Sequence, residues 1–290
     1  MGIGYQRTDR KVIDYKLWYL EDVPYALRGP RSWTGSEPYF TFAGAAQTFG
    51  RFAQVPYPEL VSGWVQRDHI NFGFAGAGPE FFLKNTKLID WINKSALCFL
   101  QVMSGRSVST KLLTAVGKGG ILKFNYGALK EKSMVALTAY EALIEAYPKE
   151  QVIEQVAEAR ANWLNAYENL LSAIQVPIVL VRVSSAPPPK SDDFSSAHKL
   201  LGLFPQLINK EWMARLASRV SRFVDCTFES ETPRILLNYT TRRPEDVFSI
   251  DQFPNHPHWA RCYNSYYPSP SMHMFVADEI TRAMGDYLIK

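Results

Sequence analysis

The chain has 290 residues, of which 47% are hydrophobic and 21% charged, so its composition is that of a globular protein large enough to need no disulfide or metal for stability. Its 32 basic and 28 acidic residues give a net charge of +4, and the small excess is not gathered into a run. We therefore expect no nucleic-acid partner.

Local features of the sequence argue against a secreted, a membrane-spanning and a metal-binding protein. Residues 1–16 lack the apolar segment of a secretory signal, and no run of about 18 apolar residues occurs that could span a membrane. A cytoplasmic protein without a membrane span is expected. None of the cysteines has a C-x-x-C spacing, and the close pair His256 and His258 has no nearby third ligand, so neither a metal nor a cofactor is expected.

Residues 1–37 mix aromatic and charged side chains without a clean period, and Arg28-Gly29-Pro30 marks a turn. They are predicted to form an irregular N-terminal arm that wraps on the rest of the chain. Residues 38–290 are predicted to form a single α/β domain, because segments typical of strands and helices alternate through them.

Five segments rich in apolar, aromatic or β-branched residues are predicted to contain the strands: 38–46, 69–79, 96–107, 176–185 and 221–230. Helical spacing of apolar residues favours helices in most of the segments between and after them: 48–65, 80–95, about 207–220 and about 271–288. Pro56 and Pro58 interrupt the first of these segments. This order predicts a parallel sheet with helices on both faces.

The segment before the fourth strand differs in character from its surroundings. Residues 108–127 are glycine-rich and expected to be irregular, whereas good helix formers dominate from 128 to 175, and Pro148 divides this stretch into two helices. The second helix has one apolar face, formed by Leu164, Tyr167, Leu170, Leu171 and Ile174. The insertion at about 128–175 could cap a site, form a homo-oligomer interface or pack on the domain's own flank.

Ligands of parallel α/β sheets bind beyond the carboxyl ends of the strands. The loops expected at that edge are residues 44–50, 75–80, 103–109 and 184–193. Two of these loops overlap short motifs that contain several small residues: Phe42-Ala43-Gly44-Ala45-Ala46-Gln47-Thr48 and Asn71-Phe72-Gly73-Phe74-Ala75-Gly76.

The element order and these motifs resemble the SGNH or GDSL-type hydrolases, a flavodoxin-like three-layer α/β/α family that acts on esters and acylated sugars. The family's first motif, roughly F-x-G-D-S-x-T, meets the first segment with Ala45 and Ala46 at the acid and serine positions. Its second motif, N-x-G-x-x-G, matches the other segment, and the resemblance implies an oxyanion-hole N–H at Gly76.

The remaining motifs of that family are incomplete in this chain. Met103-Ser104-Gly105-Arg106 stands where the third motif would place an oxyanion asparagine. In the last motif, Asn264 meets the catalytic aspartate, Tyr267 the catalytic histidine and His273 the second, non-catalytic histidine. The whole chain also resembles an uncharacterised bacterial family with the motifs G-A-A-Q-T-F-G-R-F and Y-Y-P-S-P-x-M-H.

Alanine cannot attack a carbonyl, and tyrosine, with a pKa near 10, is a poor base at neutral pH. The triad is thus degenerate at Ala46, Asn264 and Tyr267, and the usual ester hydrolysis is predicted to be absent. Polar groups remain at the expected site, and two of them are arginines that could grip an anionic group. The predicted ligand-binding residues are Gln47, Thr48, Arg51, Gly76, Ser104, Arg106, Tyr267 and His273.

Three functions fit these features. The first is a protein that binds a carbohydrate or another anionic small molecule, in polysaccharide assembly or modification. The second is a transferase with a relocated site that uses Tyr267 or His273 with Arg51 and Arg106, or a histidine of residues 255–259. The third is a structural or interaction protein acting through the helices of 128–175.

Overall fold

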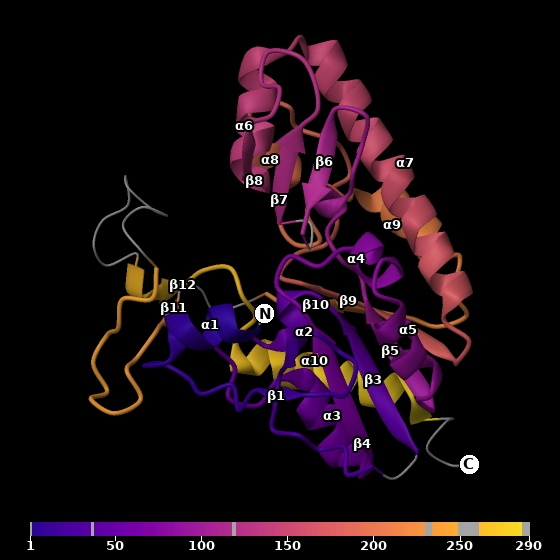
Figure 1. Cartoon of the computed structure of the whole chain (residues 1–290), viewed down its shortest axis with the longest axis vertical. Helices are drawn as coiled ribbons and strands as arrows, with labels where there is room; N and C mark the ends of the chain where they lie inside the picture. Colours follow the sequence, from indigo (N-terminus) through magenta and orange to yellow (C-terminus); the bar gives the residue numbers. More distant parts are fainter. Residues whose placement is uncertain (1, 36–37, 118–119, 230–233, 249–260, 286–290) are drawn as a thin grey trace.

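The computed structural model describes residues 2–35, 38–117, 120–229, 234–248 and 261–285 (Figure 1). At its centre is a parallel sheet of five strands in the order β10-β9-β5-β3-β4. The strands are β3 (Tyr39–Gly44), β4 (Asp68–Gly73), β5 (Leu97–Gln101), β9 (Ile178–Ser184) and β10 (Phe223–Thr227). Numbered along the chain, the order is 2-1-3-4-5, which is the flavodoxin-like arrangement.

Helices cover both faces of this sheet, so the predicted three-layer fold is confirmed. One face packs against α3 (Tyr57–Val65) and α10 (Pro270–Ala283). The other packs against α4 (Pro79–Leu83), α5 (Thr86–Asn93), α7 (Lys149–Ala173) and α9 (Lys210–Ala217). Adjacent residues of β3 serve the two cores: Phe42 lies in the first and Ala43 in the second, as the period of a strand requires.

Two predicted helical segments each form two helices in the structure, the first in line with its interruption by Pro56 and Pro58. The segment 48–65 forms α2 (Ala46–Phe49) and, after an irregular stretch, α3, because Pro56 precedes the first turn of α3 and Pro58 lies within it. The segment 80–95 forms α4 and α5 with a short break at Asn85. The remaining short elements are η1 (Gly105–Ser107), β11 (Arg234–Ile235) and β12 (Tyr263–Asn264).

Residues 113–146, part of α7 and α8 (Ala197–Leu201) form a lobe with its own core, which stands at the top of Figure 1. The prediction that 108–127 are irregular was wrong, because β6 (Leu113–Val116), β7 (Ile121–Phe124) and β8 (Ser133–Val135) pair into an antiparallel sheet. The first helix was predicted too long, since α6 (Ala136–Ala146) begins eight residues after 128. Leu122 and Phe124 point into this core, whereas the glycines mark turns between strands.

The apolar face of α7 is used inside the chain. Leu164, Tyr167, Leu170 and Ile174 are all buried in the core between α7 and the sheet, and Leu171 packs at its margin. The prediction that this face could serve an oligomer is therefore corrected: packing on the domain's own flank accounts for it.

The N-terminal arm is more regular than predicted, although it does wrap on the domain. It forms α1 (Gly2–Asp9) and a short antiparallel pair of β1 (Trp18–Tyr19) and β2 (Ala26–Leu27). Leu20, Val23 and Leu27 enter the core of the sheet, and Tyr15 packs with Phe49 of α2. Among the described residues, no helix is both long and apolar enough to cross a membrane.

Candidate functional site

The turn after β3, where the resemblance places acid and nucleophile, is closed by a glutamine of the neighbouring strand. The Oε1 atom of Gln101 accepts hydrogen bonds from the backbone N–H of Ala45 at 2.9 Å and of Thr48 at 3.2 Å. It also accepts one from the Thr48 hydroxyl at 2.5 Å. Gly44 is required here, because a Cβ atom would collide with the side chains of Thr48 and Gln101. Two backbone donors at this helix start, those of Ala45 and Thr48, are therefore used internally.

Asn71 of the second motif, on the neighbouring strand β4, stabilises the same turn. The Nδ2 atom of Asn71 donates to the Thr48 carbonyl at 2.9 Å, and its Oδ1 atom accepts from the Gly73 N–H at 2.8 Å. The Thr48 hydroxyl also lies 2.8 Å from that of Tyr57, so this predicted ligand-binding side chain is enclosed by protein. Gly76 has φ of +72° and faces Gly120 of the lobe.

Asn264, in the position of the catalytic aspartate, shapes the last loop. Its Oδ1 atom accepts from the backbone N–H of Tyr266 at 3.2 Å and of Tyr267 at 2.9 Å, and its Nδ2 atom donates to the Tyr267 carbonyl at 2.9 Å. These bonds make a tight turn that presents two adjacent tyrosine rings, packed edge to face with centroids 5.0 Å apart.

His273 lies on the first turn of α10 and is fully buried. Its Nδ1 atom accepts from the Tyr57 N–H at 3.2 Å, and its ring stacks on that of Tyr57. Burial lowers the pKa of His273 to about 3, and the nearby Arg28 and Arg234 add to the effect. An imidazole that is fully buried and has so low a pKa is a poor proton acceptor at neutral pH, which argues against His273 as the base of the transferase alternative.

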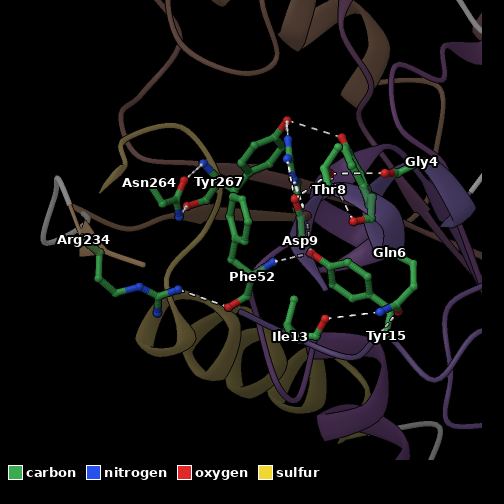
Figure 2. Close-up of polar contacts among 12 residues, drawn as sticks. Gly4, Gln6, Thr8, Asp9, Ile13, Tyr15, Phe52, Arg234, Asn264 and Tyr267 are labelled. Carbon is green, nitrogen blue, oxygen red and sulfur yellow. Dashed lines mark hydrogen bonds and ion pairs between the residues drawn. The ribbon is translucent and has the colours of Figure 1, made fainter. Parts of the chain in front are cut away.

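Arg51 is bound within a buried cluster that includes Asp9 and Tyr267, both labelled in Figure 2. Its Nε and Nη2 atoms donate to the two carboxylate oxygens of Asp9 at 2.8 and 2.9 Å, and its Nη1 atom donates to the Tyr267 hydroxyl at 3.0 Å. Burial by itself would lower the pKa of Arg51, but the Asp9 carboxylate raises it above its usual value. Tyr15 donates to the same carboxylate at 2.7 Å. The guanidinium is charged, and each of its three nitrogens already donates a hydrogen bond inside the protein.

A cavity of about 330 Å³ opens at the carboxyl edge of the sheet, between the end of β9, the start of α2 and the last loop; we call it the edge cavity. Its polar lining consists of Gln47, Ser184, Ser185, Glu229, Ser265, Tyr266 and Tyr267. Its apolar lining consists of Val183, Leu203, Phe204, Pro268 and Met272. The site therefore joins several short polar side chains to a partly aromatic wall.

Of the predicted ligand-binding residues, Gln47 and Tyr267 line the edge cavity. Ser104 lies outside it, and its hydroxyl bonds the backbone of Gln206 in the loop that carries Phe204. Arg106 also lies outside the lining, beside Tyr266: burial raises the pKa of that tyrosine and the nearby guanidinium opposes the rise. No carboxylate of the described residues forms an ion pair with Arg106.

Several residues of the site carry no sequence signal of their own. Gln101 ends a continuous apolar strand, and Asp9 lies in the arm, 42 residues before its partner Arg51. Ser184 and Ser185 stand in a segment expected at this edge, but nothing in it singles them out. No group of three potential metal ligands occurs among the residues that the structure describes, and His256 and His258 lie outside them.

Comparison with known proteins gives a family match for part of the chain. Residues 3–115 match the model of a family described as a domain of unknown function (DUF6473), so the matched part runs from the arm into the lobe. None of the curated protein sequences matches the chain.

Solved structures similar to this chain include the acetylxylan esterase Axe2 from Geobacillus stearothermophilus, with 12% identity over 87% of this chain and 95% of the esterase, and a TM-score of 0.40. A protein of the G-D-S-L family from Desulfitobacterium hafniense has 12% identity over 85% and 99%, with a TM-score of 0.39. A protein from Lactobacillus plantarum has 11% identity over 86% and 97%, with a TM-score of 0.40. From this similarity we assign neither a substrate nor catalytic residues to the chain. Its fold class is assigned from its own strand order.

Proposed function

We propose that the chain binds a carbohydrate in the edge cavity and does not hydrolyse it. The observation that carries this proposal is the lining, which combines hydroxyl and amide groups of Gln47, Ser184 and Ser185 with the rings of Tyr266 and Phe204. A sugar offers hydroxyl groups to polar side chains and C–H surface to aromatic ones, so such a mixed wall suits it.

The charges near the cavity favour a neutral sugar over an anionic one. Glu229 is the only charged side chain in the described lining, and its carboxylate would repel an anion. The two arginines that suggested an anionic ligand are placed differently, since Arg51 is paired with Asp9 and Arg106 lies outside the lining.

Absence of hydrolysis follows from the same residues. Ala45 and Ala46 supply no nucleophile, and Gln101 occupies backbone donors of their turn. Among the described residues of the lining, a carbohydrate held there would meet no activated hydroxyl and no imidazole. Binding without turnover is thus the function that this arrangement supports best.

Calorimetric titration with neutral oligosaccharides (xylotriose, cellotriose and maltotriose) and with galacturonic acid tests the proposal. Binding of at least one neutral sugar is expected, and Tyr266→Ala should weaken it about tenfold, the equivalent of about 1.4 kcal/mol of lost contact. Tyr126→Ala is the matched control, because Tyr126 is equally exposed but lies in the lobe. Binding of galacturonic acid alone, or of no neutral sugar at about 10 mM, would overturn the proposal.

A further inference from the structure

Tyr267 of the edge cavity is held at both ends by residues outside the lining. Asn264 fixes its backbone through the bonds described above. At the far end its hydroxyl accepts from Arg51 at 3.0 Å and lies 3.3 Å from the hydroxyl of Tyr5 on α1. The ring between these two ends forms part of the cavity wall. Its position thus depends on Arg51 and α1 as well as on its own loop.

Arg51 depends in turn on Asp9 for its orientation. The donors of a guanidinium lie in one rigid plane, so two hydrogen bonds to a single carboxylate fix that plane. With Nε and Nη2 bound to Asp9, the remaining Nη1 atom is directed at the Tyr267 hydroxyl. The Asp9 side chain is fully buried and that of Arg51 is 9% exposed, so water does not compete for this pair.

Aromatic rings surround the guanidinium and connect it to three parts of the chain. Its central carbon lies 4.2 Å from the ring centroid of Tyr5, 4.6 Å from that of Phe52 and 4.9 Å from that of Tyr267. Figure 2 shows Asp9, Tyr15, Phe52 and Tyr267 converging on this point. Each ring face favours a cation held above it. The charge of Arg51 therefore joins α1, the segment after α2 and the last loop.

We propose that Asp9 is a positioning residue of the edge cavity, which acts through Arg51 to hold Tyr267 in the cavity wall. Helix α1 is then a working part of the ligand site, although no residue of α1 lines the cavity. A test of this role by ligand affinity rests on the proposed function. A test by the accessibility of the cavity to a thiol reagent depends only on the geometry of the cluster.

Thiol labelling gives the structural readout. The three native cysteines are buried, whereas Ser185 of the lining is partly exposed, so Ser185→Cys, compared with the unsubstituted chain, reports access to the cavity. Adding Asp9→Asn, which removes the charge and keeps the size, should raise its labelling rate about tenfold as the wall loosens. Tyr15→Phe is the matched control: it removes a bond to the same carboxylate and leaves the Arg51 pair, so the rate should stay within about twofold.

Ligand affinity gives the second readout through a double-mutant cycle. Asp9→Asn and Tyr267→Phe should each weaken binding of a neutral oligosaccharide, but the double variant should bind no worse than Tyr267→Phe, because both changes cut one connection. Additive losses would overturn the inference. If no neutral sugar binds while labelling responds as expected, the proposed function fails and the positioning role stands.

An unchanged labelling rate in a folded Asp9→Asn protein would overturn the positioning role. Should Asp9→Asn fail to fold, Arg51→Lys replaces it in both experiments. A lysine keeps the charge beside Asp9 but cannot bind both carboxylate oxygens and Tyr267 in one plane. It is therefore expected to raise the labelling rate and weaken binding, and an unchanged rate would again contradict the proposal.

Discussion

Ala45 and Ala46 lie on a turn whose neighbouring side chains are already committed to the fold. Gln101 accepts from this turn, Tyr267 bonds Arg51 and Asn264 shapes the last loop. Catalysis by a serine needs a base within hydrogen-bond reach and an orienting group behind it, acting together. Restoring one member of a triad in this setting therefore adds a hydroxyl without activating it.

Ala46→Ser is accordingly expected to leave hydrolysis of an aryl acetate within about twofold of the wild-type chain, because no described imidazole reaches the site. The nearest histidine of the last motif, His273, is buried and has its pKa lowered to about 3. Spectrophotometry of released phenol measures the rate, with Ala45→Ser as the matched control. Clear turnover by Ala46→Ser alone would contradict this interpretation.

The ion pair between Arg160 of α7 and Asp192, in the loop after β9, should make the stability of the chain depend on pH. Arg160 of α7 donates to both oxygens of Asp192 at 2.7 and 2.6 Å, and this lowers the pKa of Asp192 although partial burial opposes it. The stabilisation is present above the unfolded pKa of about 3.9 and is lost as pH falls through the lower, folded pKa.

Asp192→Asn should therefore lower the free energy of unfolding at neutral pH by about 2 kcal/mol, the usual contribution of hydrogen bonds to a charged group. The difference from wild type should shrink as pH falls below about 4. Urea unfolding at a series of pH values measures both effects. Asp90→Asn, at an exposed pair with Lys87, should have a much smaller effect; equal losses for the two variants would exclude a special role for Asp192.

At the scale of elements, α7 joins the central domain to the lobe. Its later half packs on the sheet, whereas Val152, Val156 and Ala159 of its earlier half belong to the core of the lobe. A helix that packs into two cores is amphipathic along its whole length. The sequence therefore did not distinguish an oligomer interface from packing inside the chain.

Leu170→Asp separates those two roles. Leu170 is fully buried, so a carboxylate there should cost at least about 3 kcal/mol of stability through lost burial and an unpaired charge. Ile153→Asp, on an exposed position of the same helix, should change stability by about 0.5 kcal/mol or less. Thermal unfolding and light scattering measure stability and mass. A stable Leu170→Asp chain with a reduced mass would show an interface instead.

The sequence predicts those elements best whose pattern is local and long. β5 and β9 are nearly continuous apolar runs because both of their faces are covered, and each lies within its predicted segment. β6 and β7 have four residues each and two inward positions, so their period is too short to stand out between glycines. Pro56 and Pro58 indicated the interruption of the segment 48–65, although they did not give the bounds of α2 and α3.

In the site, too, the sequence predicts local features and misses contacts between distant residues. The motifs located the turn at Ala45-Ala46 and the loop at Asn264–Tyr267, since each is a short contiguous pattern. The pairing of Arg51 with Asp9 and the bonds of Gln101 to Thr48 join residues that are 42 and 53 positions apart. Such pairs are set by how the elements pack, and a single sequence holds no local signal of them.

At the scale of the whole molecule, the edge cavity is assembled from distant segments. Gln47 comes from α2, Ser184 from β9, Phe204 from the loop after α8, and Tyr267 from the last loop. The arm adds no lining residue, yet it covers Phe49 with Tyr15 and holds Arg51 with Asp9. Figure 1 shows α1 beside the loops that follow the strands, so the arm supports the cavity from outside.

Deleting residues 1–16 tests how far the fold depends on this support. The deletion exposes Phe49, removes the burial of Ile13 and Tyr15 at about 1.5–3 kcal/mol each, and leaves Arg51 unpaired at about 3–5 kcal/mol. The sum of these losses approaches the total stability of about 5–15 kcal/mol of an ordinary domain. The truncated chain should therefore unfold at a much lower urea concentration and bind a hydrophobic dye. Because the unpaired charge is a large share of the loss, adding Arg51→Met to the deletion should recover part of the midpoint, and no recovery would mean that burial by the arm alone holds the fold.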